Sequence, residues 1–440
     1  MQALRASSSS IIAFTGAGGK TTAMFQVARE LSATAPVLVT ASSHLGSWQV
    51  TSADKHLIVH SPDDLKTLDS KLGGITLITG EFDGDRTKPL DADGMTEVYK
   101  FCRQNSVPLL IEADGSRQRP LKAWAEHEPP IPPFVQQVVQ VVGLSGIGKP
   151  LVDEVVHRPA IFSRLSGLDV GQSITAEAVS RVALHREGGQ KNIPSGARKI
   201  ILLNQADTPE IQSVAQRMTG DLLQSFHSVV IASLEKREIF AMYEPVAGVV
   251  LAAGESTRFG QPKQLLDWKG QPFVRAVAKT ARDAGLAPVI VVVGANGGKV
   301  AIAVEGLDVR VVNNEDWARG QSSSIKKGVQ VLNSERGVGA AIFLLVDQPQ
   351  VTKSVLKALV EKHAEGLFPV VAPMVIDQRA NPVLFDRVTF PDLMDLEGDV
   401  GGRAILHKHR VEYLPWHDDR LLLDVDTPEQ YQRLISDESL

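Results

Sequence analysis

Residues 248–263 constrain the fold of this chain more than any other stretch, because they join a buried strand directly to a loop that suits phosphates. The run 249–251 is short and fully apolar, which is typical of a strand in a parallel sheet. Gly254 and Gly260 then bracket a polar segment, where the backbone can turn sharply and present N–H groups to an anion. The stretch therefore predicts an α/β unit with a ligand at the end of this strand.

Two cations lie on the same loop, Arg258 and Lys263. An arginine can bind two phosphate oxygens at once, and a lysine supplies a compact point charge. Both kinds of charge suit a triphosphate that is being cleaved. For an isolated Gly-x-x-x-Arg pattern, however, a surface loop with solvated cations is an equally good explanation.

Composition favours a soluble protein of two or three domains. The 440 residues exceed one ordinary domain, and 43% of them are hydrophobic and 22% charged. The net charge of -5 argues against a general nucleic-acid surface. A single cysteine, Cys102, excludes an intrachain disulfide and a cysteine-cluster metal site. With no secretory leader and no apolar run near the ~20 residues of a membrane span, we expect a cytoplasmic protein without membrane or nucleic-acid partners.

A second glycine-rich loop follows an expected strand at 11–14. Strand, glycine turn and helix N-terminus together form a phosphate-binding arrangement, in which Lys20 would contact the β and γ phosphates and Thr21 would hold magnesium. The first glycine of a standard motif is replaced by Phe14, so a purely structural turn remains the alternative. The predicted phosphate-binding residues here are Gly16, Gly18, Gly19, Lys20, Thr21 and Asp114.

Asp114 and Glu112 end a later apolar strand, where an acid of a phosphate-loop fold would hold magnesium. A plain acidic turn is the alternative. Three basic residues follow these acids, namely Arg117, Arg119 and Lys122. They are either a second anion site or part of a solvated loop.

The second half has further candidates at the ends of expected strands. Asp347 follows the buried run 341–346, which places its carboxylate at the edge of the sheet where α/β folds bind ligands. Magnesium on phosphates takes one or two protein carboxylates, and Asp347 would be one of them. Asp424 and Asp426 lie on one side of an extended segment near residue 425. Gly294 opens a glycine loop that suits a base or ribose, or a plain turn.

The string Leu-Ala-Ala-Gly-x-Ser-x-Arg-Phe-Gly-x-Pro-Lys resembles the signature loop of Rossmann-like nucleotidyltransferases, in the branch that transfers CMP or GMP to the molybdenum cofactor. The resemblance covers about residues 246–435 and is greatest to the molybdenum cofactor cytidylyltransferases. It implies that molybdenum-bound molybdopterin attacks the α-phosphate of CTP, with Mg²⁺ on Asp347 and Asp426. The choice of CTP over GTP as the donor follows from the resemblance. It rests chiefly on Leu-Ala-Ala-Gly, where the guanylyl branch tends to have a second glycine.

Together, the residues and the resemblance give three sets of site residues in the second half. The catalytic set is Arg258, Lys263, Asp347 and Asp426. The nucleotide-binding set is Leu251, Ala252, Ala253, Gly254, Ser256, Gly294, Ser322 and Ser323, with Ser324 in the same serine run. The acceptor-binding set is Asn381, Asp399 and Arg403. Helix caps and ordinary loops are the alternatives for the serines and for the acceptor set.

Residues 10–240 resemble the YqeC-type family, which is associated with maturation of selenium-dependent molybdenum hydroxylases. The motifs that carry this resemblance include Gly-Ala-Gly-Gly-Lys-Thr-Thr, Glu-Ala-Asp-Gly-Ser-Arg and Gly-Lys-Pro-Leu followed by His-Arg-Pro. The resemblance implies a role in the maturation of a client molybdenum hydroxylase. It does not imply which reaction the first half performs. The run 204–207 resembles the base-reading motif of GTPases with Gln205 in place of lysine, so ATP and GTP are both candidate ligands.

Pro245 separates the two halves. We expect a P-loop-like parallel-sheet domain at 1–244 and a Rossmann-like nucleotidyltransferase domain at 245–440. Two other functions fit the same residues. One is a guanylyl or sugar-phosphate nucleotidyltransferase, and the other is a nucleotide-switched molybdenum cofactor carrier without transferase activity.

Overall fold

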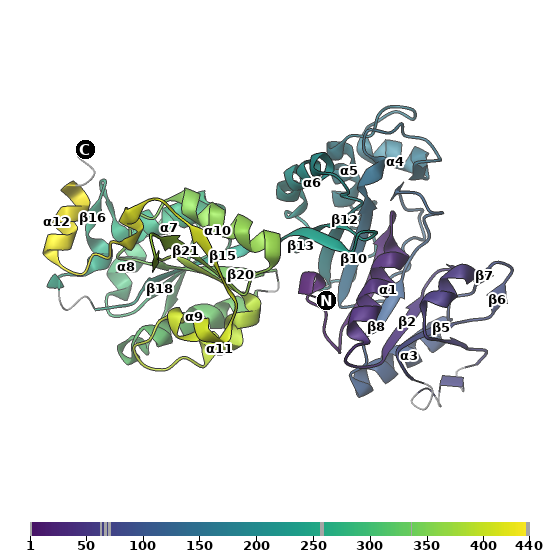
Figure 1. Cartoon of the computed structure of the whole chain (residues 1–440), viewed down its shortest axis with the longest axis horizontal. Coiled ribbons are helices and arrows are strands. Elements are labelled where there is room, and N and C mark those ends of the chain that lie inside the picture. The colour runs from purple at the N-terminus through teal and green to yellow at the C-terminus, as the bar shows by residue number, and fades with distance from the viewer. Residues whose placement is uncertain are drawn as a thin grey trace. The chain divides into compact units, whose positions relative to one another are not determined.

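The computed structural model describes residues 2–61, 64–65, 68, 72–255, 259–335 and 337–436. It divides the chain into two compact units, Met1–Tyr243 and Glu244–Leu440 (Figure 1). Each unit contains a mainly parallel sheet with helices between its strands. The predicted α/β class with parallel-sheet domains is therefore confirmed. No helix within the described ranges has the length and apolar character that a bilayer crossing requires.

The sheet of the first unit has nine strands in its described part, in the order β14-β13-β12-β10-β1-β8-β2-β5-β4. All neighbouring pairs are parallel except β13 and β14. The strands are β1 Ile11–Gly16, β2 Val37–Ala41, β4 Lys55–Ile58, β5 Ile75–Thr79, β8 Leu109–Glu112, β10 Gln137–Gly143, β12 Arg198–Asn204, β13 Ser228–Ser233 and β14 Glu238–Tyr243. The helices are α1 Lys20–Leu31, α3 Ala92–Asn105, α4 Pro159–Ser166, α5 Ala176–Leu184 and α6 Pro209–Leu222.

Two small sheets complete the first unit. One joins β3 Leu45–Gly46, β6 Phe82–Asp83 and β7 Arg86–Thr87, and the other joins β9 Leu121–Lys122 to β11 Val156–His157. In the main sheet, β1 lies between β8 and β10 and is buried at every position. The glycine loop that follows β1 therefore starts from the middle of the sheet.

The second unit has the strand order β19-β18-β15-β20-β23-β21-β22 over its described residues, with β24 beside β21. The strands are β15 Val246–Ala252, β18 Val289–Val293, β19 Arg310–Asn313, β20 Ala340–Leu345, β21 Val370–Val375, β22 Gln378–Arg379, β23 Val383–Asp386 and β24 Val411–Pro415. The helices are α7 Phe273–Asp283, α8 Gly297–Ala303, α9 Gln321–Ser334, α10 Lys353–Gly366, α11 Phe390–Met394 and α12 Pro428–Ser436. A short hairpin, β16 Asp267–Trp268 and β17 Gln271–Pro272, precedes α7.

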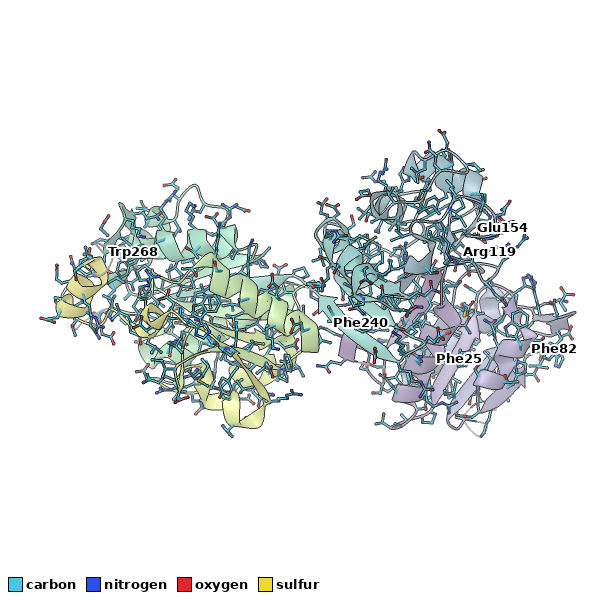
Figure 2. All side chains as sticks on the ribbon, turned by 45° about the horizontal axis from the view of Figure 1, so that its top comes forward. Phe25, Phe82, Arg119, Glu154, Phe240 and Trp268 are labelled. Carbon is cyan, nitrogen blue, oxygen red and sulfur yellow. The ribbon has the colours of Figure 1, made fainter. Side chains whose placement is uncertain are left out.

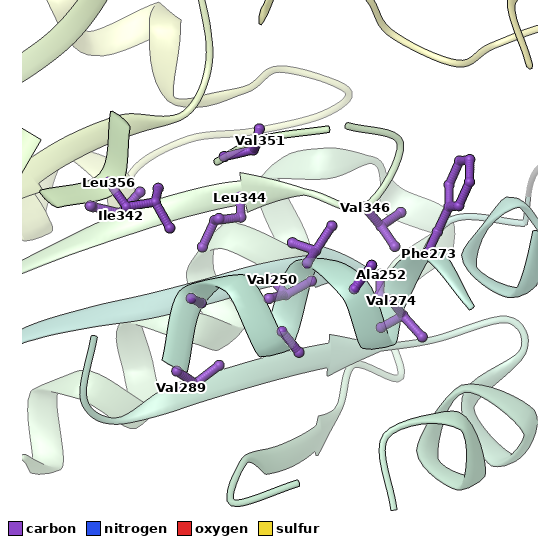
Figure 3. Close-up of a cluster of buried hydrophobic side chains, with 14 of the residues drawn as sticks. Val250, Ala252, Phe273, Val274, Val289, Ile342, Leu344, Val346, Val351 and Leu356 are labelled. Carbon is purple, nitrogen blue, oxygen red and sulfur yellow. The ribbon is translucent and has the colours of Figure 1, made fainter. Parts of the chain in front are cut away.

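Helix α7 covers one face of the second sheet. Figure 3 shows Phe273 and Val274 of this helix beside Val250 and Ala252 of β15, within a larger buried cluster that also includes Leu344 of β20. Burial of each large apolar side chain contributes about 1.5–3 kcal/mol. The packing therefore fixes β15 and β20, and with them the loops that begin where these strands end.

Candidate active site and phosphate loop

The ends of β15 and β20 open into a cavity of about 620 Å³. The two strands are parallel neighbours with Leu251 opposite Leu345, so they end at the same edge of the sheet. Predicted residues that line this cavity, which we call the nucleotide cavity, are Leu251, Ala253, Gly254, Lys263, Asp347 and Asp399. Arg258 and Ser256 lie outside the described residues.

Lys263 brings the two predicted carboxylates together. Its ammonium group donates a hydrogen bond to Asp426 and lies 4.0 Å from Oδ2 of Asp347. The backbone N–H of Val425 donates to the carbonyl of Asp347 at 3.1 Å. The segment before α12 is therefore hydrogen-bonded to the residue just beyond β20, and this places Asp426 beside the cavity.

Asp347 has a buried carboxylate with one unbonded oxygen and a raised pKa. Its Oδ1 is buried and has no hydrogen-bond partner among the described residues. Burial, followed by the nearby carboxylates of Asp424 and Asp426, raises the pKa of Asp347 to about 6, while Lys263 acts in the opposite direction. A cation at Oδ1 would satisfy this oxygen and favour its charged form.

The part of the chain that the structure describes holds no group of three or more His, Cys, Asp or Glu side chains arranged around a metal. Asp347 and Asp426 stay the predicted ligands of a divalent ion, and two carboxylates would leave the rest of its shell to phosphates and water. That division of ligands suits Mg²⁺, which keeps several waters and is bound through one or two carboxylates plus substrate phosphates.

Gln264 holds the loop that follows β15. Its side-chain amide donates to the carbonyls of Ala252 at 3.2 Å and Gly254 at 2.6 Å, and only 1% of the residue is exposed. Sequence reasoning missed this residue, because a glutamine beside Lys263 is indistinguishable from a solvated one until its burial is known. The amide fixes two of the predicted nucleotide-binding residues.

The three serines at the start of α9 differ in their surroundings. The hydroxyl of Ser322 donates to the carbonyl of Gly398 at 2.6 Å, and that of Ser323 donates to the carbonyl of Gly320 at 2.8 Å. Neither residue lines the nucleotide cavity, whereas Ser324 does. Nucleotide binding by Ser322 and Ser323 stays a prediction. Besides these backbone contacts, the Ser323 hydroxyl accepts a hydrogen bond from the side chain of Asn314 at 2.8 Å.

Gly294 lies under the loop after β15 and does not line the nucleotide cavity. A Cβ at this position would lie 2.6 Å from the carbonyl oxygen of Ala253, so a side chain would displace the loop. The glycine thus permits close packing. Its predicted contact with a base or ribose stays a prediction.

A smaller cavity of about 190 Å³ adjoins the first and shares Leu251, Gln321, Leu345 and Asp399 with it. We call it the acceptor cavity. It is lined by all three predicted acceptor residues, Asn381, Asp399 and Arg403, and also by Arg379. Asp399 additionally accepts a hydrogen bond from the backbone N–H of Gln321 at 3.2 Å, which ties the acceptor loop to the start of α9.

The acceptor cavity carries two guanidinium groups. Burial, and then the charge of Arg403, lower the pKa of Arg379. Among the residues that the structure describes, neither arginine forms an ion pair with a carboxylate. Arg379 was missed as a site residue although it stands two positions before Asn381. Two adjacent guanidinium groups without a counter-ion suit an anionic ligand.

In the first unit, the glycine loop is shaped by close backbone contacts. Gly16, Gly18 and Gly19 have φ of 98°, 82° and 124°, a region that favours glycine. A Cβ on Gly16 would lie 2.1 Å from the carbonyl oxygen of Val141, and one on Gly18 would lie 2.4 Å from Cα of Gly143. The loop can therefore adopt this path only with glycine at both positions.

Asp114 anchors the glycine loop from inside. It is fully buried and accepts hydrogen bonds from Thr15 Oγ1 at 2.9 Å, Lys122 Nζ at 2.9 Å and Trp124 Nε1 at 2.6 Å. Burial would raise the pKa of Asp114, but the ammonium groups of Lys122 and Lys20 hold it below its ordinary value. Asp114 does not line the cavity at this loop. Its role as a magnesium ligand stays a prediction, whereas Glu112 does line that cavity.

A cavity of about 500 Å³, which we call the P-loop cavity, lies at the glycine loop. Its lining includes the predicted residues Gly18, Gly19, Lys20 and Thr21, together with Glu112. Thr21 donates a hydrogen bond from its hydroxyl to Oε2 of Glu112 at 2.6 Å. Of the two predicted acids, Glu112 is thus the one beside the threonine that was expected to hold magnesium.

The segment resembling a base-reading motif also supports the glycine loop. The side chain of Asn204 donates to the carbonyl of Gly18 at 2.7 Å and accepts from the N–H of Leu234 at 2.9 Å. The carbonyl of the Gln205 side chain accepts from the Ser145 hydroxyl at 2.7 Å. Both side chains therefore have structural partners, and guanine reading remains an untested prediction.

Comparison with known proteins gives one family for each unit. A family described as "MobA-like NTP transferase domain" matches residues 248–413, and one described as "YqeC protein" matches residues 12–160. "Nicotine blue oxidoreductase" of Paenarthrobacter nicotinovorans is 32% identical over 199 residues, which are 43% of this chain and 96% of that protein.

Two further relatives cover the two halves. "Uncharacterized protein YqeC" of Escherichia coli (strain K12) is 31% identical over 219 residues, 49% of this chain and 81% of the relative. A "Probable molybdenum cofactor guanylyltransferase" of Bacillus cytotoxicus is 27% identical over 205 residues, 43% of this chain and 96% of the relative. The similarity thus spans between 81% and 96% of the length of these relatives.

Proposed function

Because the chain belongs to the YqeC family in its first unit and to the MobA-like NTP transferases in its second, we propose that the second unit transfers CMP from CTP to molybdenum-bound molybdopterin. The observation that carries the proposal is the partnerless Oδ1 of Asp347, beside Lys263 in the nucleotide cavity. The guanidinium-lined acceptor cavity adjoins this position. A site for a metal-bound triphosphate and a site for an anionic acceptor are thus neighbours.

The proposed reaction needs little acid–base chemistry. A phosphate oxygen of the acceptor forms a bond to the α-phosphorus of CTP, and the bond from that phosphorus to the bridging oxygen of the β-phosphate breaks. Pyrophosphate leaves with the electron pair of that bond. The attacking phosphate is already an anion, so the rate depends on positioning and on neutralising charge.

Lys263 is proposed to neutralise the triphosphate. Support comes from its place in the lining of the nucleotide cavity, beside Leu251, Ala253 and Gly254. Mg²⁺, held by Asp347 and Asp426, would supply further charge neutralisation on the phosphates. Arg258, on the same loop, is proposed to bind the triphosphate as the sequence predicts. Gln264 acts through the loop by fixing its carbonyls.

The acceptor is proposed to bind through its terminal phosphate to Arg403 and Arg379, since two guanidinium groups can bind several phosphate oxygens at defined angles. Asn381 and Asp399 would contact the polar remainder of the acceptor. Asp399 also accepts a hydrogen bond from the N–H of Gln321, the first residue of α9, which joins the acceptor loop to the start of that helix.

The first unit is proposed to serve the maturation of a client molybdenum hydroxylase and to bind the phosphates of ATP or GTP. The residues proposed for this site are Gly16, Gly18, Gly19, Lys20 and Thr21. Support comes from the strand–loop–helix geometry and from the P-loop cavity.

The transferase proposal is tested by pyrophosphate release from each of the four nucleoside triphosphates, with Mg²⁺, with and without molybdenum-bound molybdopterin. Release from CTP that depends on the acceptor and disappears in Asp347→Ala is the expected result. Asp308→Ala, at an aspartate whose side chain is 94% exposed, is the matched control and should retain wild-type release. Tight cofactor binding without release from any nucleotide would instead leave the cofactor-carrier function.

GTP is the second candidate donor, because a relative of the second unit is named a probable molybdenum cofactor guanylyltransferase. The same assay separates the two. Acceptor-dependent release that is greatest with GTP would replace cytidylyl by guanylyl transfer and leave the roles of Asp347 and Lys263 unchanged.

A further inference from the structure

The P-loop cavity of the first unit has an excess of positive charge. Besides Lys20, its lining includes Arg86, Arg117 and Arg119 (the last labelled in Figure 2), and Glu112 is the only carboxylate among its described lining residues. In the described ranges, neither Arg117 nor Arg119 forms an ion pair. Such a cavity suits a ligand with more negative charge than a single phosphate carries.

Part of this charge is paired. Nζ of Lys20 lies 3.5 Å from Oδ1 of the buried Asp114, and Nε of Arg86 lies 3.9 Å from Oδ1 of Asp85. Asp114 also accepts hydrogen bonds from Lys122 and Trp124, and it is not part of the lining. The next residues, 115–119, turn away from this buried group and line the cavity. Arg117 and Arg119 therefore lie where their charge faces a ligand.

Glu112 provides a separate indication of a cation. The residue is 6% exposed and lines the cavity, and its Oε2 accepts a hydrogen bond from Thr21. In the described part of the chain, no hydrogen bond reaches its Oε1. A nearly buried carboxylate with one unused oxygen, at a cavity rich in arginine, is suited to a divalent ion that bridges protein and phosphate.

The same threonine links this position to an exposed tryptophan. Gln49 donates from its side-chain amide to Oγ1 of Thr21 at 2.5 Å. A cation bound at Oγ1 would take the lone pair that this amide now uses. Trp48, the neighbour of Gln49, is 56% exposed and lines the P-loop cavity, so occupancy should change its fluorescence.

We propose that the first unit binds a nucleoside triphosphate, with a divalent cation at Glu112 and Thr21 and the terminal phosphate held by Arg117 and Arg119. This inference rests on the proposed phosphate role of the glycine loop. It adds a cation ligand other than Asp114 and a selectivity for triphosphate over diphosphate. A diphosphate would reach the glycine loop but would leave the two arginines without their ligand.

The test is a fluorescence titration of the full chain with each of the four nucleoside triphosphates and diphosphates, with Mg²⁺. Trp48→Phe identifies the part of the signal that comes from the P-loop cavity, which separates it from binding in the second unit. Arg117→Ala and Arg119→Ala should each weaken triphosphate binding about tenfold or more, and diphosphate binding by less than about threefold. Arg103→Ala, at an exposed arginine of α3 outside the cavity, should behave as wild type.

Glu112→Gln keeps the shape of the side chain and removes its charge. In this variant, Mg²⁺ should no longer increase triphosphate affinity. Amide hydrogen exchange on β1 and β8, together with circular dichroism, shows whether the first unit of the variant is folded. Undiminished dependence on Mg²⁺ in a folded Glu112→Gln variant would overturn the assignment of the cation to this residue.

Two other results separate the inference from its premise. Equal affinity for triphosphates and diphosphates, with the arginine variants unaffected, would overturn the inference while leaving the glycine loop as a phosphate site. A Trp48 signal that responds to no nucleotide and to no inorganic tripolyphosphate would overturn the phosphate site itself.

Discussion

The ammonium group of Lys263 donates a hydrogen bond to the carboxylate of Asp426, although 163 positions separate the two residues. The contact joins the loop after β15 to the segment before α12. Both ends of the second unit therefore contribute to one site, and a change at either residue should alter the charge at Asp347, which lies 4.0 Å from the same ammonium group.

Lys263→Met should lower acceptor-dependent pyrophosphate release about 10²–10³-fold, because the methionine keeps the apolar stem and removes the charge that neutralises the triphosphate. Steady-state release of pyrophosphate measures the effect. Lys279→Met, at an exposed lysine paired with Asp283 on α7, is the control. Equal losses in both variants would contradict a specific role for Lys263.

Asp347→Asn should make the second unit more stable at pH 7.5 in the absence of metal. The pKa of this carboxyl is raised from 3.8 to about 6, so the folded state binds a proton more tightly than the unfolded state. The stabilising effect of that proton is complete below pH 3.8 and is lost as the pH rises through about 6. The variant should therefore gain about 2–3 kcal/mol over wild type at pH 7.5 and nothing near pH 3.5.

Amide hydrogen exchange along β20 measures this difference without requiring the two units to unfold together. A gain that is the same at pH 7.5 and at pH 4 would show that the charge of Asp347 is not its source.

Arg379→Ala should raise the KM for the acceptor about tenfold or more and leave the KM for the nucleotide unchanged, since the guanidinium group lines the acceptor cavity alone. Initial rates at varied concentrations of both substrates measure the two constants. Arg310→Ala, at an exposed arginine paired with Glu335, is the control. A rise in both KM values would indicate a general distortion instead.

Gln264→Leu should destabilise the second unit by about 1–3 kcal/mol, because it leaves the carbonyls of Ala252 and Gly254 without their buried donor. Nucleotide affinity should fall as well. Urea unfolding and nucleotide titration measure the two effects. Gln264→Glu separates size from hydrogen bonding, since it cannot donate when ionised and should be at least as disruptive.

Asp114→Asn should destabilise the first unit by about 3 kcal/mol, since it removes the charge that pairs with buried Lys122. Hydrogen exchange on β1 and β8 reports the loss. Asp93→Asn, at an exposed aspartate of α3, should have little effect. Wild-type protection in Asp114→Asn would contradict an anchoring role.

The sequence predicted the fold class and the strand ends because these depend on local hydrophobicity. The apolar runs 249–251 and 341–346 fall in and just beyond β15 and β20, and each of these strands is buried at nearly every position. A parallel pair then brings the following residues to one edge. That is why Lys263 and Asp347, far apart in sequence, could be expected in one cavity.

The choice between Glu112 and Asp114 could not be made from sequence. Both acids stand at the end of one apolar run, and residues two apart on a strand share a face, so the pattern does not distinguish them. Strand β8 ends at Glu112, so Asp114 lies beyond the last residue of the strand. There it accepts hydrogen bonds from Lys122 and Trp124 and does not line the cavity.

The serines of α9 illustrate a similar limit. Helix α9 begins at Gln321, and each further residue turns by about 100°. A difference of one residue therefore decides which hydroxyl faces the cavity, and a helix start is not defined that closely by sequence. Arg379 and Gln264 were missed for another reason, since burial and missing counter-ions are properties of tertiary structure.

The tight contacts around Gly16 and Gly18 also affect how relatives of the first unit should be compared. These glycines are required by the backbone of Val141 and Gly143, so they would persist in a descendant that had lost every ligand. Their retention during evolution would record inheritance of the fold. Glu112, Arg117 and Arg119 have no such steric requirement, and their joint loss or retention across the family would distinguish lineages that still use the P-loop cavity from those that keep only its shape.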